Sequence, residues 1–182
     1  MTQTRIPLLF GTMTIGAPGK IGVRTSDLKE AQEIIDVFYK HGHKEIDTAR
    51  IYAEGTTESG LSYSTRCPLA GNVARNLPDV LGSKLGAMYR ARYLKHGYFD
   101  ALNYLKPIAE KHQLRLTEIA LRWVQHHSVL TPQDGVILGA SSVAQLEQNL
   151  EDSEKGPLPK EVVKALDEAR LIVGASAPTY WR

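Results

Sequence analysis

Short apolar runs alternate with amphipathic stretches along the first third of the chain. Residues 6–13 form a continuous apolar run, which predicts a buried strand. Over residues 28–38, apolar residues recur at three- and four-residue steps, the period of one helix face, and Gly42 is expected to end that helix. Thr25 or Ser26 is expected to cap its start. A second strand at residues 46–47 then completes a strand–helix–strand unit, which predicts parallel neighbours joined by a right-handed crossover.

The last third of the chain repeats this alternation. Residues 135–139 are the clearest strand, and they lead through two serines into a helix over residues 143–152. A final helix over residues 160–173 is expected to stop at Gly174. An earlier helix is predicted near residues 99–112, and Pro107 is expected to end or bend it. Another helix is predicted from residue 116, with Thr117 as its cap. Its buried side is expected to consist of Ile119, Ala120, Trp123 and Val124.

The stretch between these two parts breaks the alternation. Residues 62–72 are polar and rich in turn-forming residues, with at most one weak strand, and residues 76–86 continue as loop. No convincing crossover helix comes after the strand that ends at Asp47. For a regular succession of strands and helices, an element is missing here.

Composition places the chain among ordinary globular proteins. Its 182 residues are enough for one domain with a core, and 42% hydrophobic and 23% charged residues are typical of a soluble protein. A net charge of +2 does not argue for a nucleic-acid partner. No stretch approaches the ~18 apolar residues of a membrane helix, and the first residues lack the apolar core of a signal peptide. A cytoplasmic protein without a membrane partner is therefore expected.

Metal and disulfide chemistry are not expected. The single cysteine, Cys67, excludes an intrachain disulfide and any site with several cysteine ligands. His126 and His127 are adjacent at the end of a predicted helix, where neighbouring side chains point in different directions. A role at the helix terminus is therefore favoured over a shared metal ion.

Asp47 and Tyr52 are the first candidates for chemistry. The strand at residues 46–47 ends at Asp47, and Tyr52 lies in the next loop or turn. The carboxyl ends of strands are where α/β folds place their active sites. A phenol there could act as a proton donor if a neighbour lowers its pKa from about 10. By spacing alone, a turn Asp with a surface Tyr after it is the more frequent interpretation.

Ser141 and Ser142 mark a second candidate site. They precede the helix over residues 143–152, where two hydroxyls and free backbone N–H groups suit a phosphate. The alternative interpretation is a plain serine cap, and the residues themselves leave both open.

Three blocks in order resemble the aldo-keto reductases, and within them the aflatoxin-aldehyde reductase subgroup. The first block is LLFGTMTIG with EIDTARIYAEGTTESGL. The second is CPLAGN and then AMYRARY. The third is ALRWVQHHS, GVILGASSVAQLEQNLE and GPLP, running to the terminal TYWR. The resemblance covers most of the chain.

The resemblance implies an α/β fold, a (β/α)8 barrel of the TIM type. Such a barrel needs at least ~200 residues, so this chain is expected to be truncated. Residues 45–61 correspond to the second strand and the segment after it, and residues 62–72 to the seventh strand, so strands three to six are missing. We therefore expect a single incomplete domain of about four parallel strands in the order 7-8-1-2 with outer helices. Residues 1–61 form its N-terminal part, and residues 62–182 form its C-terminal part with the cofactor segment.

The resemblance also implies catalytic residues. The family uses an Asp, Tyr, Lys and His group, and Asp47 and Tyr52 match the first two. The Lys and His would come from strands three and four, and no residue matches them. Lys44, Arg50 and His96 are candidate substitutes without a motif to support them.

Cofactor and substrate residues carry over by the same resemblance, which implies NADPH/NADP as the cofactor. The expected cofactor-binding residues are Asp47, Cys67, Pro68, Leu69, Ala70, Gly71, Ser141, Ser142, Gln145, Gln148 and Asn149. Cys67 replaces the usual Asn, and Asn72 interrupts the usual Gly-Gly. Tyr89, Arg92 and Arg182 resemble substrate-side residues that favour aldehydes bearing a carboxylate.

The expected function is NADPH-dependent reduction of small aldehydes or ketones to alcohols, in the manner of fungal relatives of secondary metabolism. Loss of the Lys and His is expected to impair it. The alternatives are a non-catalytic relic that binds nucleotide or a partner chain, and a fragment from an incorrect gene prediction. Because open sheet edges favour self-association, a homodimer that rebuilds an eight-stranded barrel is a further hypothesis.

Overall fold

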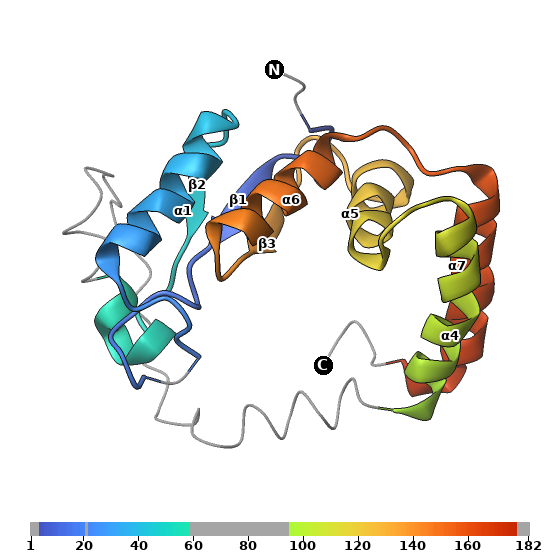
Figure 1. The fold of residues 1–182 in the computed structure, drawn as a ribbon, viewed down its shortest axis with the longest axis horizontal. Helices are drawn as coiled ribbons and strands as arrows, with labels where there is room; N and C mark the ends of the chain where they lie inside the picture. The colour runs from blue at the N-terminus through green and yellow to red at the C-terminus, as the bar shows by residue number, and fades with distance from the viewer. Residues whose placement is uncertain (1–3, 21, 59–94, 178–182) are drawn as a thin grey trace. The chain divides into compact units, whose positions relative to one another are not determined.

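The computed structural model describes residues 4–20, 22–58 and 95–177. Within these residues the chain forms two compact units. The first unit comprises residues 4–58 and 129–155, and the second comprises residues 95–128 and 156–177. Both strand-forming parts of the chain therefore belong to the first unit. Figure 1 shows the elements coloured along the chain.

The first unit is built on a parallel sheet of three strands. These are β1 (Leu8–Gly11), β2 (Glu45–Asp47) and β3 (Val136–Gly139). β1 lies between the other two, in the order β2-β1-β3, and pairs with both in parallel (Figure 1). The sheet thus joins the first and last thirds of the chain, as expected for strands eight, one and two of a barrel. The expected seventh strand, at residues 62–72, lies outside the described residues.

Two helices, α1 (Leu28–Lys40) and α6 (Val143–Glu154), complete the core of this unit and pack against each other. Alternate residues of β1 are buried, and the ring of Phe10 lies 5.8 Å from that of Phe38 on α1. Burial of each such side chain contributes about 1.5–3 kcal/mol. The largest fully buried apolar side chains in this unit are those of Ile6, Phe10, Ile15, Ile34, Ile35, Phe38, Leu146 and Leu150.

The start of α1 differs from the expected one. Asp27, rather than Thr25 or Ser26, is the N-cap, and its side chain accepts from the backbone N–H groups of Lys29 and Glu30 at 2.6 and 3.3 Å. A carboxylate here also complements the positive end of the helix dipole. Thr25 is fully buried. Leu28 is 48% exposed, so the apolar stripe of α1 begins one turn later than expected.

The second unit contains three helices. They are α4 (His96–Lys111), α5 (Leu116–His127) and α7 (Lys160–Val173), and the 3-10 turn η2 (Gly174–Ser176) comes after α7. α4 and α7 lie side by side (Figure 1). The small side chains of Ala101, Ala165 and Ala169 form their shared core with Leu105. Small residues allow helix backbones to approach closely, which explains this contact.

Three sequence expectations for the second unit are wrong in whole or in part. α4 continues through Pro107 to Lys111, so the proline does not end the helix. Arg115, and not Thr117, is the N-cap of α5. The buried residues of α5 are Glu118, Ile119 and Gln125, whereas Ala120 and Trp123 are exposed. Burial of Glu118 is possible because Arg122 Nη1 lies 2.9 Å from its Oε1.

In the described ranges, no helix combines the length and apolar character needed to span a bilayer.

Candidate functional site

Asp47 and Tyr52 meet at the carboxyl end of the sheet. Asp47 is the last residue of β2, and Tyr52 opens the short 3-10 turn η1 (Tyr52–Gly55). The Tyr52 hydroxyl donates to Asp47 Oδ2 at 3.2 Å, and both side chains are half-buried. The backbone N–H of Tyr52 donates to the carbonyl of Ala49 at 2.9 Å, which bends the chain back toward the strand. The predicted carboxylate–phenol pair is therefore present in the structure.

The surroundings of Asp47 fix its backbone. The strand register places Asp47, Gly11 and Gly139 in one row across the three strands. The other two positions of this row are glycines, and the side chain of Ile137 lies over Gly11, 2.8 Å from the position a Cβ would take there. The buried Thr12 donates to the Asp47 carbonyl through both its N–H, at 3.1 Å, and its hydroxyl, at 2.9 Å. Thr12 thus fixes the backbone of the strand end, and the carboxylate of Asp47 accepts the hydrogen bond from Tyr52.

The turn after Tyr52 has an unusual backbone. Ala53 and Glu54 have φ values of 49° and 57°, and Gly55 has a φ of 88°. For residues other than glycine the left-handed region costs about 1–2 kcal/mol each. Lys20 Nζ lies 2.6 Å from Glu54 Oε2 and joins this turn to the loop after β1. Strained backbone next to a candidate proton donor is a common feature of functional sites.

The same loop packs against the turn along its length. Thr57 is fully buried and donates to the carbonyl of Ile15 at 2.5 Å. The N–H of Ala17 donates to the hydroxyl of Thr56 at 3.0 Å. A Cβ at Gly16 would lie 2.4 Å from the Cβ of Ala53, so only glycine fits beneath this turn. Ile15, Gly16 and Ala17 in the loop after β1 therefore support the segment that carries Tyr52.

The predicted phosphate-binding residues gather at the start of α6. Ser142 is the N-cap, and its hydroxyl accepts from the N–H of Gln145 at 3.3 Å. Gln145 Oε1 in turn accepts from the N–H of Ser141 at 2.9 Å and from its hydroxyl at 3.2 Å. The N–H groups of the first helical residues have no acceptor within the helix. Ser141, Ser142, Gln145 and these N–H groups together fit a phosphate, because they supply hydroxyl, amide and backbone donors. The side chain of Gln145 must turn away before the donors of Ser141 can bind the phosphate.

The remaining residues of this segment complete the same edge of the sheet. Asn149 Nδ2 donates to the carbonyl of Gly139 at 3.4 Å, and Gln148 is exposed on α6. The loop after β1 reaches this segment too, because the hydroxyls of Thr14 and Thr25 donate to the carbonyls of Ala140 and Ser141 at 3.1 and 3.5 Å. One loop therefore contacts both the Tyr52 turn and the start of α6.

Several predicted site residues lie outside the described residues. They are Cys67, Pro68, Leu69, Ala70, Gly71, Tyr89, Arg92 and Arg182. Of the candidate substitutes for the missing Lys and His, Lys44 precedes β2, at the end of the strand opposite Asp47. Arg50 is exposed, and His96 belongs to the second unit. The structure thus brings Asp47 and Tyr52 together.

Sequence reasoning missed three residues that shape the Tyr52 turn, namely Gly16, Lys20 and Glu54. A pair of residues 34 positions apart carries no local pattern, so the Lys20–Glu54 contact could not be foreseen. Residues 16–23, in the loop after β1, contain three glycines and a proline. The packing function of this loop emerges once Ala53 is seen above Gly16.

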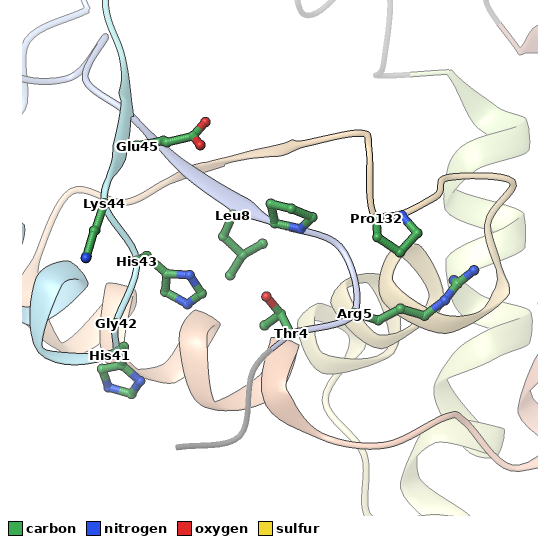
Figure 2. A pocket seen from close by; sticks show the side chains of 10 residues that line it. Thr4, Arg5, Leu8, His41, Gly42, His43, Lys44, Glu45 and Pro132 are labelled. Carbon is green, nitrogen blue, oxygen red and sulfur yellow. The ribbon is translucent and has the colours of Figure 1, made fainter.

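A pocket of about 750 Å³ lies at the opposite edge of the sheet, at the amino ends of β1 and β2 (Figure 2). The imidazole of His43 lines it and stacks on Phe38 with ring centroids 5.0 Å apart. Burial lowers the pKa of His43, and its Nε2 has no hydrogen-bond partner among the described residues. His41 Nδ1 lies 3.0 Å from Glu154 Oε1 at the end of α6. Because Tyr52 lies at the other edge, this pocket is separate from the candidate site.

No group of three or more potential metal-ligating side chains occurs within residues 4–58 and 95–177. The described part of the site therefore consists of a phenol, a carboxylate and a set of hydrogen-bond donors.

Comparison with known proteins identifies the family. The chain matches the aldo/keto reductase family over residues 7–64 and 73–171. It therefore belongs to that family, whose fold is the (β/α)8 barrel, and the three parallel strands are a part of such a barrel. The match includes β1, β2 and β3, together with Asp47, Tyr52 and the start of α6.

Individual relatives agree with this assignment. An aldo-keto reductase of Pseudocercospora fijiensis is 36% identical over 135 residues, which cover 67% of this chain and 46% of the relative. Aflatoxin B1 aldehyde reductase member 2 of Mus musculus is 41% identical over 107 residues, 56% of this chain and 29% of the relative. Aldo-keto reductase family 7 member A3 of Homo sapiens is 38% identical over 141 residues, 68% of this chain and 43% of the relative. The chain spans less than half the length of each of these relatives.

Proposed function

We propose that this chain binds NADPH and reduces small aldehydes or ketones to alcohols, with Tyr52 as the proton donor. The observation that carries the proposal is the hydrogen bond between Tyr52 and Asp47 at the carboxyl edge of the sheet. Membership of the aldo/keto reductase family supports it. The names of the relatives, which include aflatoxin B1 aldehyde reductases, suggest an aldehyde as substrate.

In this proposal Tyr52 transfers its phenolic proton to the carbonyl oxygen. Asp47 accepts a hydrogen bond from the phenol, which orients the hydroxyl. The bound cofactor supplies the hydride that adds to the carbonyl carbon. The substrate carbonyl would lie at the carboxyl edge of the sheet, next to the Tyr52 hydroxyl.

The start of α6 would hold the adenosine phosphate of the cofactor. Ser141, Ser142 and the first backbone N–H groups supply donors, and Gln145, Gln148 and Asn149 flank them. Helix N-termini favour anions because their N–H groups are unpaired and the helix dipole is positive there. An additional phosphate distinguishes NADPH from NADH, so the proposed site predicts a preference for NADPH. The segment from Cys67 to Gly71 is proposed to cover the pyrophosphate.

Nucleotide binding without turnover is the second candidate function. A phenol with a pKa of about 10 is a weak general acid unless a cation stabilises its anion. Lys20, a cation that reaches the Tyr52 turn, pairs with Glu54 at 2.6 Å. Low or absent turnover with retained NADPH binding would favour this second function.

Turnover separates the two candidates. The full chain, in excess over the cofactor, is incubated with NADPH and a small aldehyde. Oxidation of NADPH is monitored by absorbance. Aldehyde-dependent oxidation that is lost in Tyr52→Phe supports the reductase. Saturable NADPH binding without oxidation, unchanged in Tyr52→Phe, supports the binding function instead.

Further parts of the proposal concern assembly and substrate. We propose that the chain is one incomplete domain that acts in the cytoplasm, and that two copies associate through sheet edges to complete a barrel. Tyr89, Arg92 and Arg182 are proposed to bind the carboxylate of the aldehyde. Size-exclusion chromatography coupled to light scattering tests the assembly: a dimer mass supports it, and a folded monomer at all concentrations contradicts it.

A further inference from the structure

The turn that carries Tyr52 is held in a conformation that its own residues do not favour. Ala53 and Glu54 adopt φ values of 49° and 57°, although neither is glycine. For residues other than glycine the left-handed region is unfavourable, and here two such residues stand in succession. Conformations of this kind persist only where surrounding structure determines them. Contacts from outside the turn must therefore hold it.

Those contacts come from the loop after β1. Lys20 Nζ donates a hydrogen bond to Glu54 Oε2 at 2.6 Å, and Glu54 is the second of the two strained residues. Lys20 is placed by two turns of its own loop, because its N–H donates to Ala17 and its carbonyl accepts from Val23, each at 3.3 Å. Below the turn, Gly16 leaves the space that the buried Ala53 methyl occupies. Gly16 permits the strained conformation, and the ion pair favours it.

We infer that Lys20 and Glu54 are positioning residues that hold Tyr52 against Asp47. The inference deepens the proposed function, since it gives these two residues a role in aiming the proton donor. Tyr52 directly precedes the strained residues, so relaxation of Ala53 and Glu54 to ordinary backbone would redirect its side chain. The hydroxyl would then leave Asp47 Oδ2, which it contacts at 3.2 Å.

The exposure of the pair argues for positioning rather than overall stability. The side chains of Lys20 and Glu54 are 39% and 46% exposed. Ion pairs with this exposure contribute little to the free energy of unfolding and weaken as salt concentration rises. The pair therefore acts on the local equilibrium of the turn, and added salt is expected to loosen the Tyr52–Asp47 contact without unfolding the chain.

Tyrosine-selective ¹³C labelling of the full chain and NMR test the inference without any need for turnover. The Tyr52 ring signal is identified by its loss in Tyr52→Phe. In the wild-type chain, Asp47→Asn should shift this signal because the two side chains are in contact. Lys20→Met and Glu54→Gln should each move the signal toward its position in the denatured chain. In either background, Asp47→Asn should no longer shift it.

The matched control is Lys29→Met. Lys29 and Glu33 form an exposed pair on α1, 3.9 Å apart and away from the turn. This substitution removes the same charge and should leave the Tyr52 signal unchanged. A rescue completes the design: in Lys20→Met/Glu54→Gly the glycine adopts positive φ without strain, so the Tyr52 signal and its response to Asp47→Asn should return.

Two results would overturn the inference. One is a Tyr52 signal in Lys20→Met that matches the Lys29→Met control and still responds to Asp47→Asn. The other is loss of the Ile34 methyl signals in a second Lys20→Met sample labelled at the isoleucine methyl groups. Ile34 is fully buried in the core, so this loss would show that the pair stabilises the whole unit. Failure of the proposed reductase function would show itself as absent NADPH binding or oxidation, and these NMR outcomes do not depend on either.

Discussion

The hydroxyl of Tyr52 donates to Oδ2 of Asp47 at 3.2 Å, across the bend between the end of β2 and the next turn. If Tyr52 is the proton donor, Tyr52→Phe should lower aldehyde-dependent NADPH oxidation about 10²–10⁴-fold, the usual contribution of a general acid. NADPH affinity should stay unchanged, because the phenylalanine ring keeps the shape of the site. Initial rates at saturating aldehyde and a parallel binding titration measure the two effects.

Tyr39→Phe is the control for this prediction, since Tyr39 lies on α1 outside the candidate site. It should leave the oxidation rate at the wild-type value. A rate in Tyr52→Phe equal to that of Tyr39→Phe would show that the phenol of Tyr52 has no part in the reaction.

The two N-caps of the first unit allow stability and cofactor binding to be separated. Ser142 caps α6 at the proposed phosphate site, and Asp27 caps α1 elsewhere. Replacement of either by Ala should lower the free energy of unfolding by about 1 kcal/mol through loss of the cap. Only Ser142→Ala should also weaken NADPH binding. Equal NADPH affinity in the two variants would count against a phosphate site at Ser142.

Gly16 is predicted to tolerate no side chain. A Cβ at this position would lie 2.4 Å from Ala53 and 3.0 Å from the Thr56 hydroxyl. Gly16→Ala should therefore lower the free energy of unfolding by about 1–3 kcal/mol, as overpacking of a buried contact does. Gly156→Ala is the control, because nothing lies within 4 Å of its Cβ position. In urea denaturation monitored by circular dichroism, the free energy of unfolding of Gly16→Ala should be well below that of both the control and the wild-type chain.

His127 is predicted to make the second unit sensitive to acid. Its Nε2 accepts a hydrogen bond from the N–H of Leu158 at 3.0 Å, and protonation would remove that acceptor. Burial, together with His126 and Arg122, lowers its pKa from 6.5. The folded state favours the neutral form of His127. The contribution of this neutral side chain to the free energy of unfolding is therefore present above pH 6.5. It is lost as the pH falls from 6.5 through the lowered pKa of the folded state.

His127→Gln tests this pH dependence, because its amide oxygen replaces the acceptor but does not titrate. Thermal unfolding of the variant should vary less between pH 7.5 and pH 5, about one unit or more to either side of the ordinary histidine pKa. An identical pH dependence in the variant and the wild-type chain would contradict the assignment.

The sheet and its flanking helices could be predicted from local sequence patterns. The apolar runs at residues 6–13 and 135–139 contain β1 and β3, and the helix expected at residues 160–173 matches α7. Caps were less predictable, because Thr25, Ser26 and Asp27 are all good N-caps and three-dimensional packing selects among them. Thr25 is buried against the carbonyl of Ser141, which leaves Asp27 at the helix start.

Burial on α5 could not be predicted from apolar spacing. The pattern indicated Ala120 and Trp123, whereas Glu118 and Gln125 are buried. Glu118 is buried because Arg122 neutralises it, and this partner lies one turn away on the same helix. Arg122 also donates to the carbonyls of Gly156 and Pro157, at 2.7 and 2.8 Å, which no local pattern indicates.

The candidate site was predictable where a motif and a strand end coincide. Asp47 and Tyr52 were indicated by the strand boundary and the family resemblance, and their hydrogen bond is present. The Lys20–Glu54 pair and the contact of Gly16 with Ala53 depend on long-range packing of a loop against a turn. Neither has a sequence signature.

Titration of the purified full chain with NADPH, followed by cofactor fluorescence, tests whether the start of α6 binds the cofactor phosphate. A parallel titration uses NADH. We predict saturable binding that is tighter for NADPH than for NADH and that loses this preference in Ser142→Ala. Binding of neither cofactor, or equal binding of both, would contradict a phosphate site at the start of α6 and with it the proposed NADPH-dependent function.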